Sequence, residues 1–218
     1  MLGVAGPDGE ERLRRDGFDA LLDDVRLVRK LLERRGIELT PAPLLFYLLV
    51  RHALIEREIH DRQLADYTAA ILLEFGRIGR SDPLRRDALP DTIYLTDILK
   101  EIDRARGERE FALRLHLGHM ALWLGGVFPD FITTRVQRRG AVPITYYDEM
   151  GASGFRSAAA MSIAAREDVG GLLLHLADHF VDVRSALNGL SDALFFPTPG
   201  NPVERMLREV SDRMRRLG

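Results

Sequence analysis

The six histidines of this chain occur as three close pairs, and imidazole nitrogens can ligate a transition metal or transfer a proton. The members of a pair are three, four or eight residues apart, and a glutamate lies midway in the widest pair. Residues three or four apart lie on one face of a helix. Helical bundles hold iron, manganese or zinc with such histidines and with carboxylates from neighbouring helices. The candidate metal ligands are His52, Glu56, His60, His116, His119, His175 and His179.

The same histidines also suit a structural role. His116 and His119 each come one position before an apolar residue of a predicted helix, and so do His175 and His179. A histidine at the edge of an apolar face packs its ring against neighbours while a nitrogen reaches a carbonyl or water. Neither Glu-x-x-His nor His-Glu-x-x-His occurs in the sequence. A shared metal site therefore requires three helices to bring their histidine pairs together.

Other catalytic motifs are missing from the sequence. It has no Gly-x-Ser-x-Gly elbow, no phosphate-binding Gly-x-x-x-x-Gly-Lys-Ser/Thr and no Gly-x-Gly-x-x-Gly. It has no cysteine, which excludes thiol catalysis, disulfides and zinc ribbons. The stretch from Arg114 to His119 resembles the arginine–four residues–histidine motif of HEPN-type ribonucleases, but Leu115 is apolar where that family usually has a polar residue. These patterns identify no catalytic residue.

An aromatic and glycine-rich stretch fits two arrangements. One is a pocket floored by Trp123, with His119 and the hydroxyls of Tyr146 and Tyr147 pointing in. The other is a tight corner between two helices. We favour the corner, because Gly125 and Gly126 are predicted to end a helix there.

The charge and hydropathy of the chain restrict its partners. Its 31 lysines and arginines and 33 aspartates and glutamates give a net charge of −2, which argues against a nucleic-acid-binding surface. The longest apolar runs, Leu44–Val50 and Met120–Phe128, are shorter than the ~20 residues that span a bilayer. The N-terminus lacks the basic and apolar regions of a signal peptide. We therefore expect a cytoplasmic protein with no membrane span.

Apolar residues recur with a helical period through most of the chain, and no segment alternates as a strand does. The predicted fold class is all-α, a single-domain helical bundle of seven or eight helices. The predicted helices cover residues 18–35, 42–75 with a break near Asp61, 92–105, 108–125, 130–138, a segment from 143, 167–196 and 203–217. The predicted domains are a flexible tail over 1–16, a bundle core over 17–200 and an amphipathic helix over 201–218 that docks on the core or on a partner.

Two predicted packing surfaces bear on function. Residues 151–160 are rich in glycine, serine and alanine, so a neighbouring helix can approach closely there. The helix over 167–196 carries a heptad seam: Val169, Leu173, Leu176, Phe180, Val183, Leu187, Leu190 and Leu194. This seam motivates the main hypothesis, a protein that acts through protein–protein contact, as a homodimer or with a protein partner. The alternative is a metal-dependent enzyme or sensor in which iron, manganese or zinc activates water or dioxygen.

The stretch from His119 to Asp130, followed by Tyr146–Gly151 and Phe155, resembles a group of uncharacterised bacterial helical proteins. That group has a leucine-rich segment ending in Gly-x-Phe and then a Tyr-Tyr…Met-Gly segment. The resemblance covers under half of the chain and implies a bacterial source and an all-helical fold. It implies no activity and no catalytic residue.

Overall fold

The computed structural model of the chain describes residues 22–26, 40–80, 95–139 and 142–194. In these ranges the regular structure is helical and contains no strand, which confirms the all-α fold class. The chain divides into two compact units, Met1–Arg77 and Ile78–Gly218. The predicted tail over 1–16 and the predicted helix over 201–218 lie outside the described residues.

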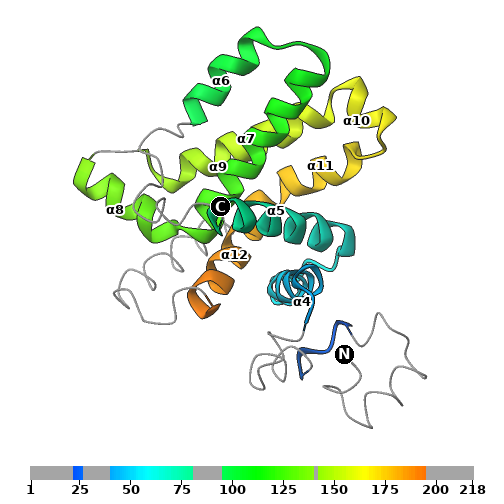
Figure 1. The fold of residues 1–218 in the computed structure, drawn as a ribbon, viewed down its shortest axis with the longest axis vertical. Helices are drawn as coiled ribbons and strands as arrows, with labels where there is room; N and C mark the ends of the chain where they lie inside the picture. The colour runs from blue at the N-terminus through cyan, green and yellow to red at the C-terminus, as the bar shows by residue number, and fades with distance from the viewer. Residues whose placement is uncertain (1–21, 27–39, 81–94, 140–141, 195–218) are drawn as a thin grey trace. The chain divides into compact units, whose positions relative to one another are not determined.

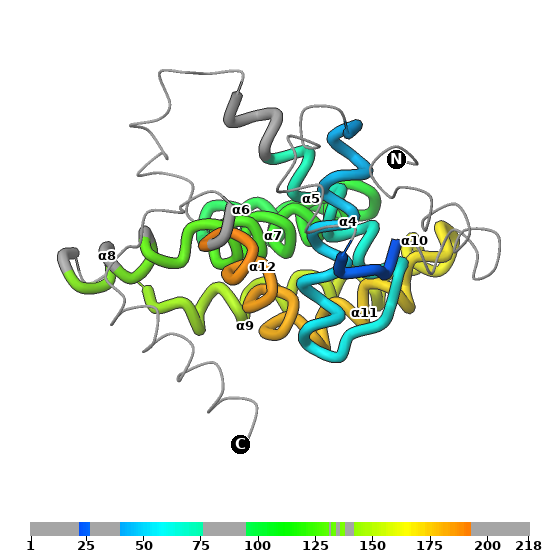
Figure 2. Tube along the Cα trace, turned by 90° about the horizontal axis from the view of Figure 1, so that it is seen from below, coloured from blue at the N-terminus to red at the C-terminus, as the bar shows by residue number. Residues whose placement is uncertain are grey.

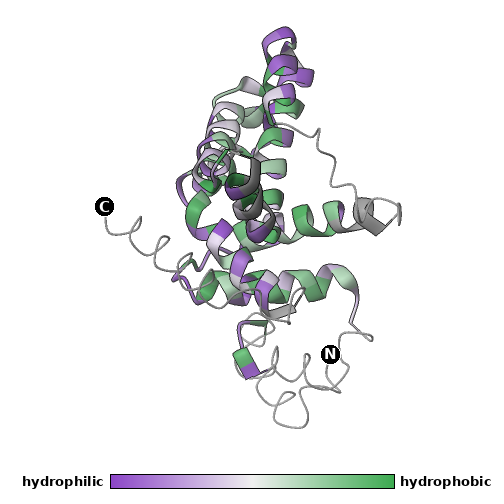
Figure 3. Cartoon of the chain, turned by 90° about the vertical axis from the view of Figure 1, so that its left-hand side faces the viewer, coloured by the Kyte–Doolittle hydropathy of each residue, from purple (hydrophilic) through white to green (hydrophobic). Residues whose placement is uncertain are grey.

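The first unit contains α4 (Ala42–Ile55) and all but the last turn of α5 (Arg62–Arg80) (Figure 1). The described helices of the second unit are α6 (Leu95–Arg104), α7 (Gly107–Val127), α8 (Pro129–Arg139), α9 (Ile144–Ala159), α10 (Ser162–Arg166), α11 (Gly170–Asp178) and α12 (Phe180–Leu194). Hydrophobic and hydrophilic residues are mixed along these helices (Figure 3). Within the described ranges, no helix is both long enough and apolar enough to cross a membrane.

A short turn separates the two helices of the first unit. The buried apolar residues of α4 are Leu48, Leu49, Val50 and Leu54. The helix ends at Ile55, and Glu58 in the following turn has a left-handed φ of 63°. Asp61 caps the start of α5, because its Oδ1 accepts the backbone N–H of Leu64 at 3.1 Å. The predicted break near Asp61 is confirmed.

Two predicted helix boundaries in the first unit differ from the structure. Helix α5 continues past the predicted end at Phe75 to Arg80, since a glycine such as Gly76 weakens a helix without always ending it. The helix predicted over 18–35 is described only at 22–26, where the backbone is not helical for two residues. One of these two residues is an aspartate that binds arginines of α4 and α5.

Helix α7 is the centre of the second unit. It contacts α6, α8, α9, α10 and α12, and it lies beside α9 (Figures 1 and 2). The two helices approach closely through glycine. A Cβ on Gly154 would lie 2.8 Å from the carbonyl oxygen of Arg114, and one on Gly118 would lie 2.7 Å from the ring of Phe155. The close helix contact predicted for residues 151–160 is therefore confirmed.

The helix predicted over 167–196 is two helices in the structure. Helix α11 begins at Gly170 and ends at Asp178, and α12 begins at Phe180 after a bend at His179. On the two sides of this bend, α11 packs mainly on α9 and α12 packs mainly on α7. The buried residues of the predicted seam are Leu173, Leu176, Phe180, Val183 and Leu187. This part of the seam is enclosed within the chain itself, so it offers no free surface to a second copy.

Candidate functional site

The predicted metal ligands of the first unit do not share one helix face. His52 is buried near the end of α4, where its Nε2 lies 3.0 Å from the backbone carbonyl oxygen of Leu22. Since a carbonyl only accepts hydrogen bonds, Nε2 donates this one. Glu56 and His60 are exposed and lie beyond Ile55, where α4 has ended. The prediction that these three residues lie along one helix is therefore wrong.

The second histidine pair is divided between the surface and the core. His116 is exposed, whereas His119 is partly buried with its ring centroid 5.6 Å from that of Phe155. Burial lowers the pKa of His119 to about 4, and the nearby His116 adds to this effect. His119 is therefore neutral at pH 7, and it packs against an aromatic ring as the structural alternative predicts.

The third pair lies at the bend between α11 and α12. The ring centroids of His175 and His179 are 4.7 Å apart, and the ring planes make an angle of 76°. Nδ1 of His179 is 3.9 Å from Oδ2 of Asp182. Both imidazoles are partly exposed. The two rings of this pair are therefore in direct contact.

The described residues contain no group of three or more histidine, aspartate or glutamate side chains that could hold a metal ion. The first histidine pair belongs to the first unit, and the other two pairs belong to the second. An iron, manganese or zinc site shared by all three pairs stays a prediction, and no contact that we describe supports it.

The aromatic and glycine-rich stretch contains the junction between α7 and α8. Helix α7 continues through Gly125 and Gly126 and ends at Val127, so these glycines do not end the helix as predicted. The ring centroids of Trp123 and Phe128 lie 5.4 Å apart in an edge-on arrangement at this junction. The aromatic contact supports the corner rather than the pocket.

A fully buried arginine joins α12 to α9 in the second unit. Arg184 is 0% exposed, and its Nε donates to Oδ1 of Asp148 at 2.8 Å. Its Nη1 donates to Oδ1 of Asn188, also at 2.8 Å. Gly125 leaves room for this side chain, because a Cβ there would lie 3.2 Å from Cδ of Arg184. A buried guanidinium needs such partners, since an unpaired charge is strongly unfavourable in apolar surroundings.

The same network satisfies the end of α7. The side-chain amide of Asn188 donates to the carbonyl oxygens of Gly125 at 2.7 Å and Gly126 at 2.8 Å. The hydroxyl of Ser191 donates to the carbonyl oxygen of Val127 at 2.7 Å. The last carbonyls of a helix have no partner within the helix, so they need donors from elsewhere. We therefore interpret this network as structural, because its polar atoms join α7, α9 and α12.

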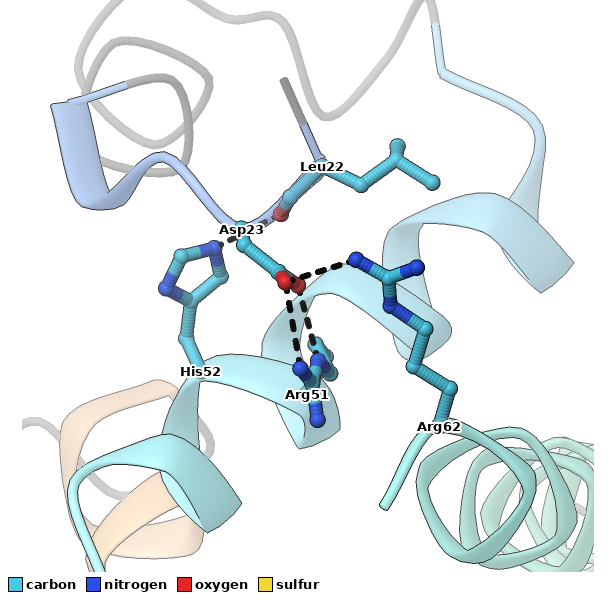
Figure 4. A network of polar contacts seen from close by, with 5 residues as sticks. All are labelled: Leu22, Asp23, Arg51, His52 and Arg62. Atoms are coloured by element: carbon cyan, nitrogen blue, oxygen red, sulfur yellow. Dashed lines mark hydrogen bonds and ion pairs between the residues drawn. The ribbon is translucent and has the colours of Figure 1, made fainter. Parts of the chain in front are cut away.

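The first unit contains a second cluster of charged residues, centred on one carboxylate (Figure 4). Arg51 in α4 is 3% exposed and donates through Nε at 2.8 Å and Nη2 at 3.1 Å to the two oxygens of Asp23. Arg62 at the start of α5 donates through Nη2 to Oδ2 of the same carboxylate at 2.9 Å. The hydrogen bond from Arg51, helped by Arg62 and opposed by partial burial, lowers the pKa of Asp23 to about 2. Three charge-assisted hydrogen bonds therefore hold Asp23 on α4 and α5.

The residue before this aspartate is held as well. Leu22 is 7% exposed, and its backbone carbonyl accepts the hydrogen bond from His52. We call residues 22–26 the docked segment. One backbone carbonyl and one carboxylate of this segment are thus bound by side chains of α4 and α5 (Figure 4).

Unused hydrogen-bonding capacity lies on the same two helices. Three buried side-chain atoms of the described residues have no hydrogen-bond partner: Nη1 of Arg51, Nδ1 of His52 and Oγ1 of Thr68. All three belong to α4 or α5. A buried polar group without a partner is unfavourable by about 1–3 kcal/mol. We therefore take Arg51, His52 and Arg62, which all bind residues 22–26, as the candidate functional site and call it the arginine site.

Sequence reasoning missed the arginine site, although one signal pointed to it. Arg51 and His52 follow directly after the apolar run Leu44–Val50. A charged residue in a segment predicted to be central and buried requires a buried partner. The partner, Asp23, is 28 residues from Arg51 in the sequence and belongs to no motif.

Comparison of the chain with protein-family models, with curated proteins and with solved structures finds no match.

Proposed function

We propose that this protein acts through protein–protein contact, by holding a chain segment that carries a leucine followed by an aspartate on α4 and α5. The observation that carries the proposal is the docked segment itself, in which Leu22 is buried and Asp23 is bound by two arginines. A partner segment with the same two residues would meet the same contacts.

The arginine site would recognise such a segment through its individual contacts. Paired guanidinium donors from Arg51 match the two oxygens of a carboxylate, which a lysine would not do. His52 fixes the backbone through a carbonyl oxygen. The side chain of Leu22, which provides that carbonyl, is itself buried. Protein modules that recognise short segments combine a side-chain anchor with backbone hydrogen bonds in the same way.

The proposed contact surface is the arginine site and not the heptad seam that the sequence suggested. Most of the predicted heptad seam is enclosed within the second unit, whereas the arginine site is partly open, since the side chain of Arg62 is 41% exposed. A homodimer remains compatible with the proposal, because every copy carries both the site and the segment and exchange of identical elements produces dimers. A cytoplasmic location stays a prediction.

Peptide binding tests the proposal. We would titrate a fluorescent peptide of residues 18–27 into the full-length Asp23→Ala protein and measure anisotropy. We expect saturable binding that weakens at least about tenfold, or 1.4 kcal/mol, when the peptide carries Asp23→Ala or the protein also carries Arg62→Ala. A peptide with Val25→Ala is the matched control, because Val25 is 50% exposed and its side chain should contribute little.

Two results would contradict the proposal. One is the absence of saturable binding by the unmodified peptide. The other is equal binding of the unmodified and Asp23→Ala peptides, which would show that the arginines do not select a carboxylate. Light scattering on the unmodified protein at high concentration would show whether a second copy is the partner.

A further inference from the structure

We infer that the docked segment is an internal competitor, which occupies the arginine site until a partner segment displaces it. The inference rests on the proposed function and adds its regulation. The structural relationship behind it is the binding of Asp23 by Arg51 and Arg62 within one chain.

The internal segment and a partner segment exclude each other, because both would accept hydrogen bonds from the same N–H groups. The Nε2 of His52 has a single N–H, and the carbonyl of Leu22 already accepts it. The Nε of Arg51 likewise has one N–H, which Asp23 accepts. A partner carboxylate and carbonyl in these positions therefore require the docked segment to leave.

Displacement is feasible because the docked segment leaves part of the site unsatisfied. It does not reach Nη1 of Arg51, which is buried and has no partner among the described residues. A partner segment that also placed a carbonyl or carboxylate oxygen on Nη1 would form a hydrogen bond that the internal segment lacks. The ion pair between Asp23 and Arg62 is also accessible, since the side chains of these residues are 27% and 41% exposed.

The internal segment has the advantage of being tethered. It belongs to the same chain as α4 and α5, so it binds the site intramolecularly and has a high effective concentration there. A tethered competitor lowers the apparent affinity of a free ligand in proportion to the fraction of sites that it occupies. We therefore expect the unmodified protein to bind a partner segment more weakly than a variant whose own segment is released.

The experiment compares three full-length proteins with the same fluorescent peptide of residues 18–27. We expect Asp23→Ala to bind the peptide at least about tenfold more tightly than the unmodified protein. Val25→Ala should bind like the unmodified protein, because the exposed Val25 is not expected to hold the segment. If Asp23→Ala does not fold, as judged by circular dichroism, Asp23→Asn replaces it, since that variant keeps the shape and one acceptor oxygen.

Hydrogen exchange gives a second measurement on the unmodified protein. An excess of unlabelled peptide should accelerate amide exchange in residues 22–26, because displacement exposes them. Equal peptide affinities for the unmodified and Asp23→Ala proteins would overturn the internal competitor while leaving the docking function intact. Failure of the peptide to bind either protein would overturn both.

Discussion

The side-chain amide of Asn188 lies 2.7 Å from the carbonyl oxygen of Gly125, although the two residues are 63 positions apart in the sequence. Asn188 therefore connects α12 to the end of α7, and its side-chain oxygen Oδ1 accepts a hydrogen bond from Arg184. Replacing Asn188 by alanine leaves these groups buried without their partner. We expect Asn188→Ala to lower the free energy of unfolding by about 2–4 kcal/mol.

Urea denaturation measures this effect, and the neighbouring Gly189 provides the control. A Cβ on Gly189 would meet nothing within 4 Å, and the residue lies inside α12. Gly189→Ala should therefore leave stability unchanged or raise it by up to about 1 kcal/mol. If Asn188→Ala proves as stable as Gly189→Ala, the amide does not hold the end of α7.

The buried ion pair between Arg184 and Asp148 gives a second prediction. Asp148→Ala would leave a fully buried guanidinium without its carboxylate, which we expect to lower the free energy of unfolding by about 3–5 kcal/mol. The double variant Asp148→Leu/Arg184→Leu removes both charges and should be less destabilised than Asp148→Ala. Thermal and urea denaturation compare the two. A double variant that is less stable than Asp148→Ala would contradict this expectation. It would show that the buried ion pair stabilises the fold more than two leucines in the same positions do.

The environment of His119 predicts a pH dependence of stability. Its pKa falls from the ordinary 6.5 to about 4 in the folded chain, so the unfolded chain binds the proton more readily between these values. Stability should therefore decrease as the pH falls from about 6.5 toward about 4. Urea denaturation across this range measures the slope. His119→Gln lacks the titrating group and should show a smaller slope; an unchanged slope would assign the effect to other residues.

The close contact between α7 and α9 predicts that a single methyl group is unfavourable. A Cβ on Gly154 would lie 2.8 Å from a backbone oxygen of α7, which cannot move without moving the helix. We expect Gly154→Ala to lower the free energy of unfolding by about 1–3 kcal/mol. Gly171→Ala is the matched control, since a Cβ there would meet nothing within 4 Å. Equal melting temperatures for the two variants would contradict the observed helix separation.

Local patterns in the sequence predict most of the described helices and some of their ends, because these depend on residues close together in the chain. The predicted break near Asp61 is present in the structure, where Asp61 caps α5 through a hydrogen bond to the backbone N–H of Leu64. The bend at His179 was not predictable in this way. The apolar spacing is regular on both sides of it, and the bend depends on which helix each half packs against.

The candidate site could be predicted only in part, for a related reason. Arg51 was recognisable as a charge beside an apolar run, but its partner Asp23 is distant in the sequence. The spacing of the histidines suits metal ligation as well as a structural role. The structure places His52 against a backbone carbonyl and His119 against an aromatic ring, which are roles that spacing does not distinguish from metal binding.

The glycines of the second unit restrict how its sequence can change over time. Gly118 faces the ring of Phe155, and Gly151 faces the ring of Phe180. In each pair, the glycine has no side chain, and this leaves room for the large ring opposite it. A related chain with alanine or serine at the first position should then carry a smaller residue at the second. Such paired exchanges of volume, rather than the identity of either residue alone, would mark sequences that share this helix arrangement.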